Sequence, residues 1–313
     1  MDLYFADAIG REFNHLKRKK ELRNRIVPFV CPESDNIRNR YFNNPDFKVI
    51  IDSGMPLVWR EDQNVTIDDY TEFCLQNLQS AELVYSLSRR PGRPGQTNIT
   101  SKEVEESASR NSENYEYMVK KGIPAARLIY AFHQGEPFNW LKQAVNNTKH
   151  IALFPYFADE REKRGAIEWL HECMSCVLDK HGRPIIDLHS LANSFKIMKL
   201  FPWSTVYLTN WEFPGGASGK IYIPLEKQGV YDYSSTRPNL IHVSEFDSLS
   251  PHIKRVVINY LESLSIPLGL SESEKGACNS RGVRQFLNTR YINMFAKTIG
   301  DVAYRDDRTK GLF

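Results

Sequence analysis

Short apolar runs alternate with longer amphipathic stretches along most of the chain. The runs are rich in β-branched and aromatic side chains, as in strands that are buried on both faces. On this basis we predict strands at residues 3–5, 49–51, 83–85, 128–132, 151–154, 185–186, 205–207 and 221–223.

The stretches between these runs have the apolar spacing and the end signals of helices. Thr66 can cap the N-terminus of one helix, and another stops at Gly122, with Pro124 beyond it. We predict helices at residues 67–78, 101–121, 138–145, 166–178, 251–264 and 283–299.

Strand–helix alternation of this kind over 313 residues predicts an α/β fold, a (β/α)8 TIM barrel. An open, doubly wound sheet is the alternative, although the glycine-rich phosphate loop of dinucleotide-binding versions does not follow the first run. Residues 211–238, rich in Gly, Tyr and Ser, predict a hairpin-like insertion. We therefore expect a barrel domain over residues 1–250 and, packed on it, a C-terminal helical extension over residues 251–313.

Composition narrows the class of protein only slightly. The chain is 41% hydrophobic and 25% charged, with a net charge of +3, so no strong overall field favours a nucleic-acid partner. Its five cysteines are scattered, which is typical of reduced thiols. No apolar run is long enough to cross a membrane and the N-terminus has no secretion signal, so we expect a cytoplasmic protein without a membrane partner.

Basic residues cluster in two places. Those between Arg11 and Arg25 predict one helix with a solvated basic face. The second cluster lies in a Pro/Gly loop after a predicted strand and consists of Arg89, Arg90 and Arg93. Guanidinium groups on such a loop suit contacts with the phosphates of a nucleic-acid backbone.

Polar residues follow most of the predicted strands. In a barrel of parallel strands the C-terminal strand ends form one rim, which carries the active site. Each polar residue alone has an ordinary structural role available; Asp52, for example, could accept a hydrogen bond within the next turn. Together they favour a functional site made of Asp7, Asp52, Ser88, Arg89, Arg90, His133, Tyr156, Asp187, His189 and Asn210.

A metal site is one interpretation of part of this set. Asp187 and His189, together with Asp52 and His133, could ligate a metal ion in a barrel hydrolase. Denser ligand spacings such as His-x-His are missing, and we predict neither a metal nor another cofactor.

Six stretches of the chain together resemble one protein family. They lie between Phe47 and Pro224 and read IIDSG, TIDDYTEFC, EVEESASRNSENYEYMVKKGI, FHQGEPFNWL, FPWSTVYLTNW and GKIYIP. The chain resembles the queuine tRNA-ribosyltransferase-like superfamily and, more closely, its short phage and bacterial members, the 7-deazaguanine DNA transglycosylases. The resemblance implies a TIM barrel that exchanges guanine in a nucleic acid for a 7-deazaguanine base such as preQ0. Such a protein would act in the cytoplasm of the host cell if it is phage-encoded.

The resemblance implies roles for some residues. Asp52 matches the acid of the Asp-Ser-Gly signature, which handles protons at the base, and residues 133–136 match a loop near the base pocket. Tyr207 stands where the family has the aspartate that attacks the sugar C1′. A phenol, with an ordinary pKa of about 10, replaces that aspartate only if it is activated. Three outcomes stay open: attack by Asp187, attack by an activated Tyr207, or loss of catalysis.

Our leading hypothesis is guanine exchange in DNA, in preference to tRNA. We expect a catalytic set of Asp52, Asp187 and Tyr207, a base pocket of His133, Gln134, Gly135, His189 and Asn210, and backbone contacts from Arg89, Arg90 and Arg93. The alternatives are a catalytically silent barrel that binds nucleic acid or serves as a partner subunit, and the metal-dependent hydrolase. A paralogous subunit or a second copy of the chain is the expected protein partner.

Overall fold

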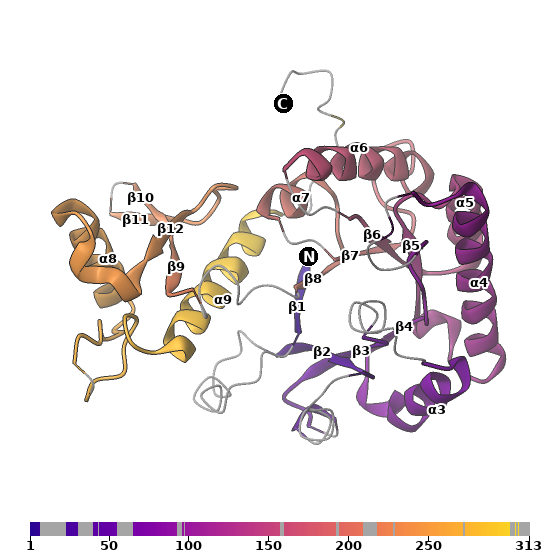
Figure 1. Cartoon of the computed structure of the whole chain (residues 1–313), viewed down its shortest axis with the longest axis horizontal. Coiled ribbons are helices and arrows are strands. Elements are labelled where there is room, and N and C mark those ends of the chain that lie inside the picture. The colour runs from indigo at the N-terminus through magenta and orange to yellow at the C-terminus, as the bar shows by residue number, and fades with distance from the viewer. Residues whose placement is uncertain are drawn as a thin grey trace.

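The chain forms a closed barrel of eight strands that pair in the order of the sequence (Figure 1). The computed structural model describes residues 1–6, 23–30, 40–42, 44–54, 65–92, 96, 98–156, 160–191, 194–208, 218–227, 229–271, 273–300, 304 and 306. Every pairing around the barrel is parallel, and β8 closes the ring on β1. The strands are β1 (Asp2–Ala6), β2 (Asn24–Pro28), β3 (Lys48–Asp52), β4 (Leu83–Tyr85), β5 (Leu128–His133), β6 (His150–Phe154), β7 (Asp187–Ser190) and β8 (Thr205–Leu208). The predicted (β/α)8 barrel is confirmed.

The membership of the barrel differs from the prediction at two strands. The sequence pattern does not predict β2, because the apolar run of this strand is short and directly follows basic residues. Arg25 is buried on β2, with its guanidinium carbon 5.3 Å from the ring centroid of Tyr41, so the prediction that Arg25 lies on a helix is wrong. Residues 221–223 belong to β9 (Lys220–Ile223), which pairs outside the barrel with β12 (Asn239–His242).

Helices connect the strands and cover the outside of the barrel (Figure 1). α4 begins with a capping box, in which Thr100 Oγ1 accepts from Glu103 N at 3.2 Å and Thr100 N donates to Glu103 Oε2 at 2.8 Å. No helix in the described ranges combines the length and the apolar character needed to span a bilayer. The elements are α3 (Ile67–Asn77), η3 (Leu78–Ser80), α4 (Ser101–Lys120), η4 (Ala125–Arg127), α5 (Phe138–Asn147), α6 (Glu160–Val177), α7 (Phe195–Leu200), η5 (Val243–Ser248), α8 (Pro251–Ser263) and α9 (Arg281–Thr298).

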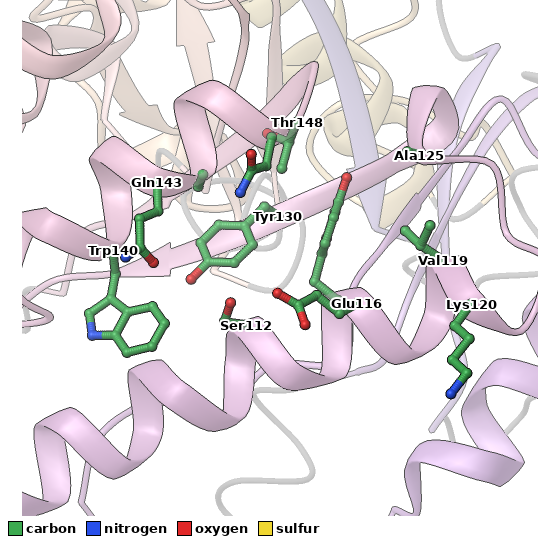
Figure 2. A pocket seen from close by; sticks show the side chains of 12 residues that line it. Ser112, Glu116, Val119, Lys120, Ala125, Tyr130, Trp140, Gln143 and Thr148 are labelled. Carbon is green, nitrogen blue, oxygen red and sulfur yellow. The ribbon is translucent and has the colours of Figure 1, made fainter.

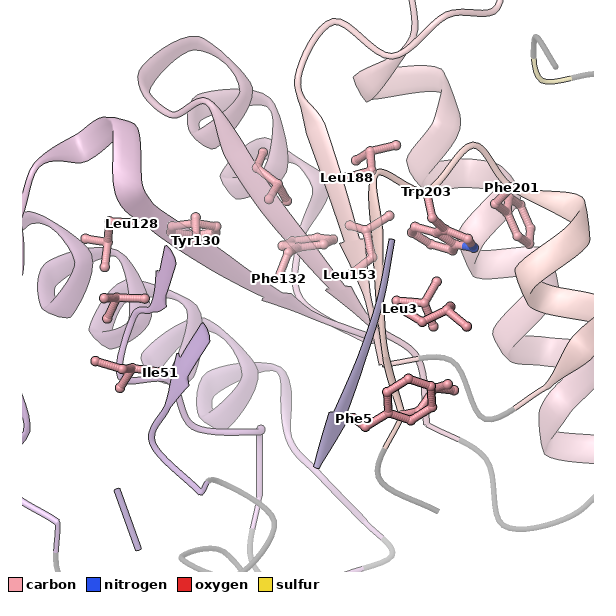
Figure 3. Packing of buried hydrophobic residues seen from close by; sticks show 14 of the residues in the cluster. Leu3, Phe5, Ile51, Leu128, Tyr130, Phe132, Leu153, Leu188, Phe201 and Trp203 are labelled. Carbon is pink, nitrogen blue, oxygen red and sulfur yellow. The ribbon is translucent and has the colours of Figure 1, made fainter. Parts of the chain in front are cut away.

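Side chains alternate along each barrel strand between the barrel interior and the surrounding helices. The inward set includes Ile50 on β3 and Ala131 on β5. The outward set packs beneath the helices, together with Phe201 and Trp203 from the segment between α7 and β8. Figure 3 shows part of this cluster: Leu3, Phe5, Ile51, Leu128, Tyr130, Phe132, Leu153, Leu188, Phe201 and Trp203. Asp52 and His133 stand two positions after Ile50 and Ala131, so they continue the inward rows at the C-terminal strand ends.

A smaller lobe lies beside the barrel (Figure 1). Inside the predicted insertion, β10 (Leu225–Lys227) and β11 (Val230–Asp232) form an antiparallel hairpin, while β9, β12 and α8 share a separate hydrophobic cluster. α9 contributes Leu287 to this cluster and Phe295 to the barrel cluster, so it joins the two parts. The C-terminal helices therefore share their core with β9 and β12, and the division of the chain at residue 250 stays a prediction.

Candidate active site

Asp52 ends β3 at the C-terminal rim of the barrel. Its side chain is buried, only 6% exposed, and its Oδ2 accepts a hydrogen bond from Gly54 N at 3.1 Å. Burial raises the pKa of Asp52 to about 6, although the backbone donors of Gly54 and Ser53 work in the opposite direction. A carboxyl group with this pKa can give and take a proton near neutral pH.

Gly54 lets the chain turn directly after Asp52. Its φ is +78°, and a Cβ there would lie 2.8 Å from the carbonyl oxygen of Val30. We expect Gly54→Ala to lower the free energy of unfolding by about 2–4 kcal/mol, measured by urea denaturation, because strain and a backbone clash add together. Gly229→Ala is the matched control: its φ is +79° but no atom lies within 4 Å of its Cβ, so only strain of about 1–2 kcal/mol should appear. Equal losses would contradict the contact with Val30.

His133 ends β5 at the same rim and is fully buried. Its Nδ1 is hydrogen-bonded to the hydroxyl of Tyr156, which places these two rings edge to edge with their centroids 5.9 Å apart. The His133 ring stacks on Phe154 at a centroid distance of 5.0 Å. Burial and then the positive charge of Arg90 lower the pKa of His133 to about 3, so the ring is neutral at pH 7. Its Nε2 is buried without a hydrogen-bond partner among the described residues, which leaves this atom available to a ligand.

The arginines of the Pro/Gly loop lie next to this stack. The guanidinium carbon of Arg90 is 3.9 Å from the ring centroid of Tyr156, which is a cation–π contact. Arg90 is half-buried and Arg89 is exposed. Their position at the rim is the one predicted for contacts with a nucleic-acid backbone, and the contacts themselves stay a prediction.

Asn111 of α4 holds the arginine loop and the turn after β5 together. Arg89 N donates to Asn111 Oδ1 at 2.8 Å, and Asn111 Nδ2 donates to Arg89 O at 3.0 Å. The same Nδ2 donates to Glu136 Oε1 at 2.8 Å, and Glu136 Oε2 accepts from His133 N at 2.9 Å. Burial raises the pKa of Glu136 to about 8. One amide therefore fixes the backbone on both sides of the site.

Tyr85 and Tyr207 connect Asp52 to the histidine stack inside the barrel. The ring centroid of Tyr85 lies 6.4 Å from that of Tyr207 and 6.0 Å from that of Phe154. Ile51 of β3 pairs with Val84 of β4, so the next residues on these strands, Asp52 and Tyr85, lie side by side. Burial and then the charge of Asp52 raise the pKa of Tyr85. Tyr207 is buried on β8 and belongs to the inward set. We call the following residues the rim cluster: Asp52, Tyr85, Arg90, His133, Phe154, Tyr156 and Tyr207.

Asp187 and His189 lie away from the rim. β7 begins at Asp187, which is therefore at the N-terminal end of its strand, exposed, with Oδ1 accepting from Ser204 Oγ at 2.9 Å. The ring nitrogens of His189 contact His150 Nδ1 at 3.2 Å and Thr205 Oγ1 at 2.6 Å, and these partners begin β6 and β8. The prediction that Asp187 and His189 belong to the catalytic rim is therefore wrong.

The remaining predicted residues are only partly described. Gln134 and Gly135 form the turn after β5, where Gln134 Oε1 accepts from Tyr156 N at 2.8 Å and Gly135 is exposed with φ +99°. Their contact with a base stays a prediction. Arg93 and Asn210 lie outside the described residues.

The four residues of the hypothetical metal site do not come together. Asp52 and His133 are at the C-terminal rim, whereas Asp187 and His189 are directed to the other end of the barrel. Within the described part of the chain, no group of three or more His, Cys, Asp or Glu side chains is placed to hold a metal ion. The geometry contradicts this four-residue ligand set.

Three residues that shape the site have no individual role in the sequence-based prediction. Glu136 stands three positions after His133, and this spacing is the readable signal for an acid that accepts from a backbone N–H within a turn. Asn111 lies in a polar stretch of α4 and Tyr85 in an apolar strand. Neither has a local signal, because each matters through contacts with distant parts of the chain.

Comparisons with known proteins do not assign this chain to a family. No family model matches the sequence. No curated protein matches it either. Among solved structures it is similar to a psychrophilic glycoside hydrolase family 10 endo-β-1,4-xylanase, with 11% sequence identity and a TM-score of 0.36, over 67% of this chain and 86% of that one. The description of the barrel rests on its strand pairing and not on this similarity.

Proposed function

We propose that the rim cluster exchanges a guanine base in a nucleic acid, DNA in preference to tRNA, for a 7-deazaguanine base. The observation that carries the proposal is the buried carboxyl of Asp52, whose pKa is about 6 and which stands in an Asp-Ser-Gly sequence. The aromatic rings, the neutral histidine and the arginine around it provide stacking, hydrogen-bonding and phosphate-binding groups. These are the groups that recognition of a base in a nucleic acid requires.

Asp52 can act in both halves of an exchange. As an acid it gives its proton to the departing guanine while the bond between C1′ and the base nitrogen breaks and its electron pair goes to the base. As a carboxylate it then takes the ring N–H proton of the incoming base while the new bond from nitrogen to C1′ forms. Both protonation states are needed in turn, so exchange should be fastest near pH 6.

Tyr207 is the sugar-facing group in this proposal. Asp187 lies at the opposite end of the barrel, whereas Tyr207 is inside it and packs against Tyr85. The oxygen of Tyr207 would stabilise the positive charge that develops on the sugar as the base leaves.

The target base has to leave the duplex to reach a buried carboxyl at the rim of a barrel. Flipping a base costs a few kcal/mol, which stacking on aromatic side chains and phosphate contacts can offset. Tyr156 and its partner Arg90 are the described residues placed for stacking, and the exposed Arg89 is placed for a phosphate.

A polymer-incorporation assay tests the proposal. The full-length protein is incubated with labelled preQ0 or labelled guanine and either DNA or tRNA, and the label in the polymer is measured over time. We expect label to enter DNA faster than tRNA. Label in neither polymer, while DNA binding is retained in a fluorescence anisotropy titration, would reject the exchange.

A catalytically silent barrel is the second candidate function. The observation that favours it is Tyr207, which stands where the family that the chain resembles has its attacking aspartate. Such a protein would bind nucleic acid, or serve a paralogous subunit or a second copy of the chain, without changing a base. It predicts DNA binding in the assay above and no incorporation.

Tyr207→Phe separates the two candidates further. The variant keeps the ring that packs against Tyr85 and removes only the oxygen. If exchange occurs, we expect its initial rate to fall about 100-fold with DNA binding unchanged. Tyr130→Phe alters an outward-facing ring on β5 and should leave the rate as it is. Equal rates for Tyr207→Phe and the unmodified protein would remove Tyr207 from the mechanism.

A further inference from the structure

A groove of about 370 Å³ lies on the outer wall of the barrel, between α4, α5 and β5 (Figure 2). α4 contributes Tyr115, α5 contributes Trp140 and Gln143, and β5 contributes Tyr130. Tyr130 belongs to the outward set of β5, whereas His133 of the rim cluster continues the inward row of the same strand. The groove and the rim cluster are therefore on different sides of the barrel wall.

Two buried hydroxyl groups in the groove lack hydrogen-bond partners among the described residues. They belong to Tyr115 and Tyr130, whose side chains are 6% and 3% exposed and whose rings meet edge to face at 5.7 Å. Figure 2 shows the hydroxyl of Tyr130 directed into the space between Trp140 and Ser112. Burial raises the pKa of Tyr115 to about 12 and also raises that of Tyr130, so both remain donors at neutral pH. Unpaired buried hydroxyls are unfavourable, and a ligand with hydrogen-bond acceptors would satisfy them.

The walls of the groove suit a flat ring with a polar edge. Trp140 donates its Nε1 proton to Glu105 Oε1 at 3.0 Å, which fixes the indole before any ligand arrives. Aromatic faces of this kind stack on nucleobases. Gln143 and Asn147 add amides that combine a donor and an acceptor, the pair that matches the edge of adenine.

Charge and size limit the ligand further. Glu116 and Lys120 both line the groove, so one negative and one positive group offset each other and phosphate is not specifically attracted. The volume of about 370 Å³ is near the lower end of the usual range for small-molecule sites, roughly 300–1,000 Å³. We propose that this groove binds a purine as the free base or nucleoside, at a site separate from the rim cluster. The inference does not depend on base exchange.

Isothermal titration calorimetry of the full-length protein with adenosine tests this inference. We expect saturable binding to one site, with no comparable signal from ribose. Tyr130→Phe should weaken the affinity about fivefold by removing one hydrogen bond. Trp140→Leu should weaken it about tenfold or more by removing the stacking face. Adenosine monophosphate should bind no more tightly than adenosine.

Two measurements show whether a loss of affinity comes from the groove itself or from a loss of folding. Tyr130→Phe removes a hydroxyl without a partner, so its melting temperature without ligand should be unchanged or higher. Asp52→Asn, in the rim cluster, should bind adenosine as the unmodified protein does. No saturation at millimolar adenosine, or an affinity that Tyr130→Phe leaves unchanged, would overturn the inference. Binding abolished by Asp52→Asn alone would also overturn it, because the purine would then occupy the rim.

Discussion

Replacing Asp52 with asparagine should abolish base exchange and at the same time make the folded protein more stable at pH 7. The amide cannot transfer the proton, so we expect the exchange rate to fall about 10²–10⁴-fold. The amide oxygen can still accept from Gly54 N, so the turn after β3 is kept. A variant that is inactive because it misfolds would lose stability, whereas this one should gain it.

The gain follows from the raised pKa of Asp52. Its pKa is about 6 in the folded protein and 3.8 without the protein environment, so the protonated form favours folding. The protonated carboxyl contributes up to about 3 kcal/mol to the free energy of unfolding. This contribution is fully present below pH 3.8 and is lost as the pH rises through 6. Urea denaturation from pH 4 to pH 7 should show that Asp52→Asn gains stability relative to the unmodified protein as the pH rises, by up to about 3 kcal/mol. Glu136 and His133 titrate in both proteins, so their contributions cancel in this difference.

The exposed Asp46, just before β3, provides the control for this measurement. Asp46→Asn removes a carboxyl group that faces water, and we expect it to keep the pH dependence of the unmodified protein. An Asp52→Asn variant with the same pH dependence as the unmodified protein would show that Asp52 is not desolvated.

Asn111→Ala should have a large effect on the site, although Asn111 is not a member of the rim cluster. Asn111 is buried, accepts from Arg89 N and donates to Arg89 O and Glu136 Oε1. Its removal leaves Arg89 N and the buried Glu136 Oε1 without this partner, whereas Arg89 O keeps its hydrogen bond from Ser107 Oγ. We therefore expect the free energy of unfolding to fall by about 2–3 kcal/mol. Exchange should also fall, because the arginine loop and the turn of His133 lose their shared anchor.

Asn114→Ala is the matched comparison on the same helix. Asn114 makes one hydrogen bond to this region, from its Nδ2 to Leu87 O at 3.0 Å. We expect a loss of about 1 kcal/mol from urea denaturation. Equal losses for the two variants would contradict the view that Asn111 joins two loops.

The barrel is readable from the sequence because most strands are short apolar runs between well-capped helices. Asp52 and His133 can be predicted as site residues for the same reason. Each ends an apolar run, and the alternation of side chains along the strand directs it to the interior of the barrel. β2 is less visible because Arg25, at its start, is a charged residue buried on the strand. Local hydrophobicity does not distinguish that position from the basic segment before it.

β7 shows why the prediction of Asp187 and His189 at the rim fails. The apolar pair at residues 185–186 precedes the strand, and Ile185 is 54% exposed. The strand itself reads Asp-Leu-His-Ser, with Asp187 and His189 on the row that faces the interior and Leu188 and Ser190 on the row that faces the helices. Only the pairing of β7 with β6 and β8 reveals this register, and pairing between strands is not a local property of the sequence.

In the proposed reaction, Asp52 transfers a proton during guanine exchange at the rim of the barrel. Incorporation of labelled guanine into DNA, measured from pH 4.5 to 8 for the unmodified protein and Asp52→Asn, tests it most directly. We expect a rate maximum near pH 6 for the unmodified protein, no measurable incorporation by Asp52→Asn, and equal DNA binding by both. Incorporation by Asp52→Asn at the rate of the unmodified protein, or none by either, would contradict it.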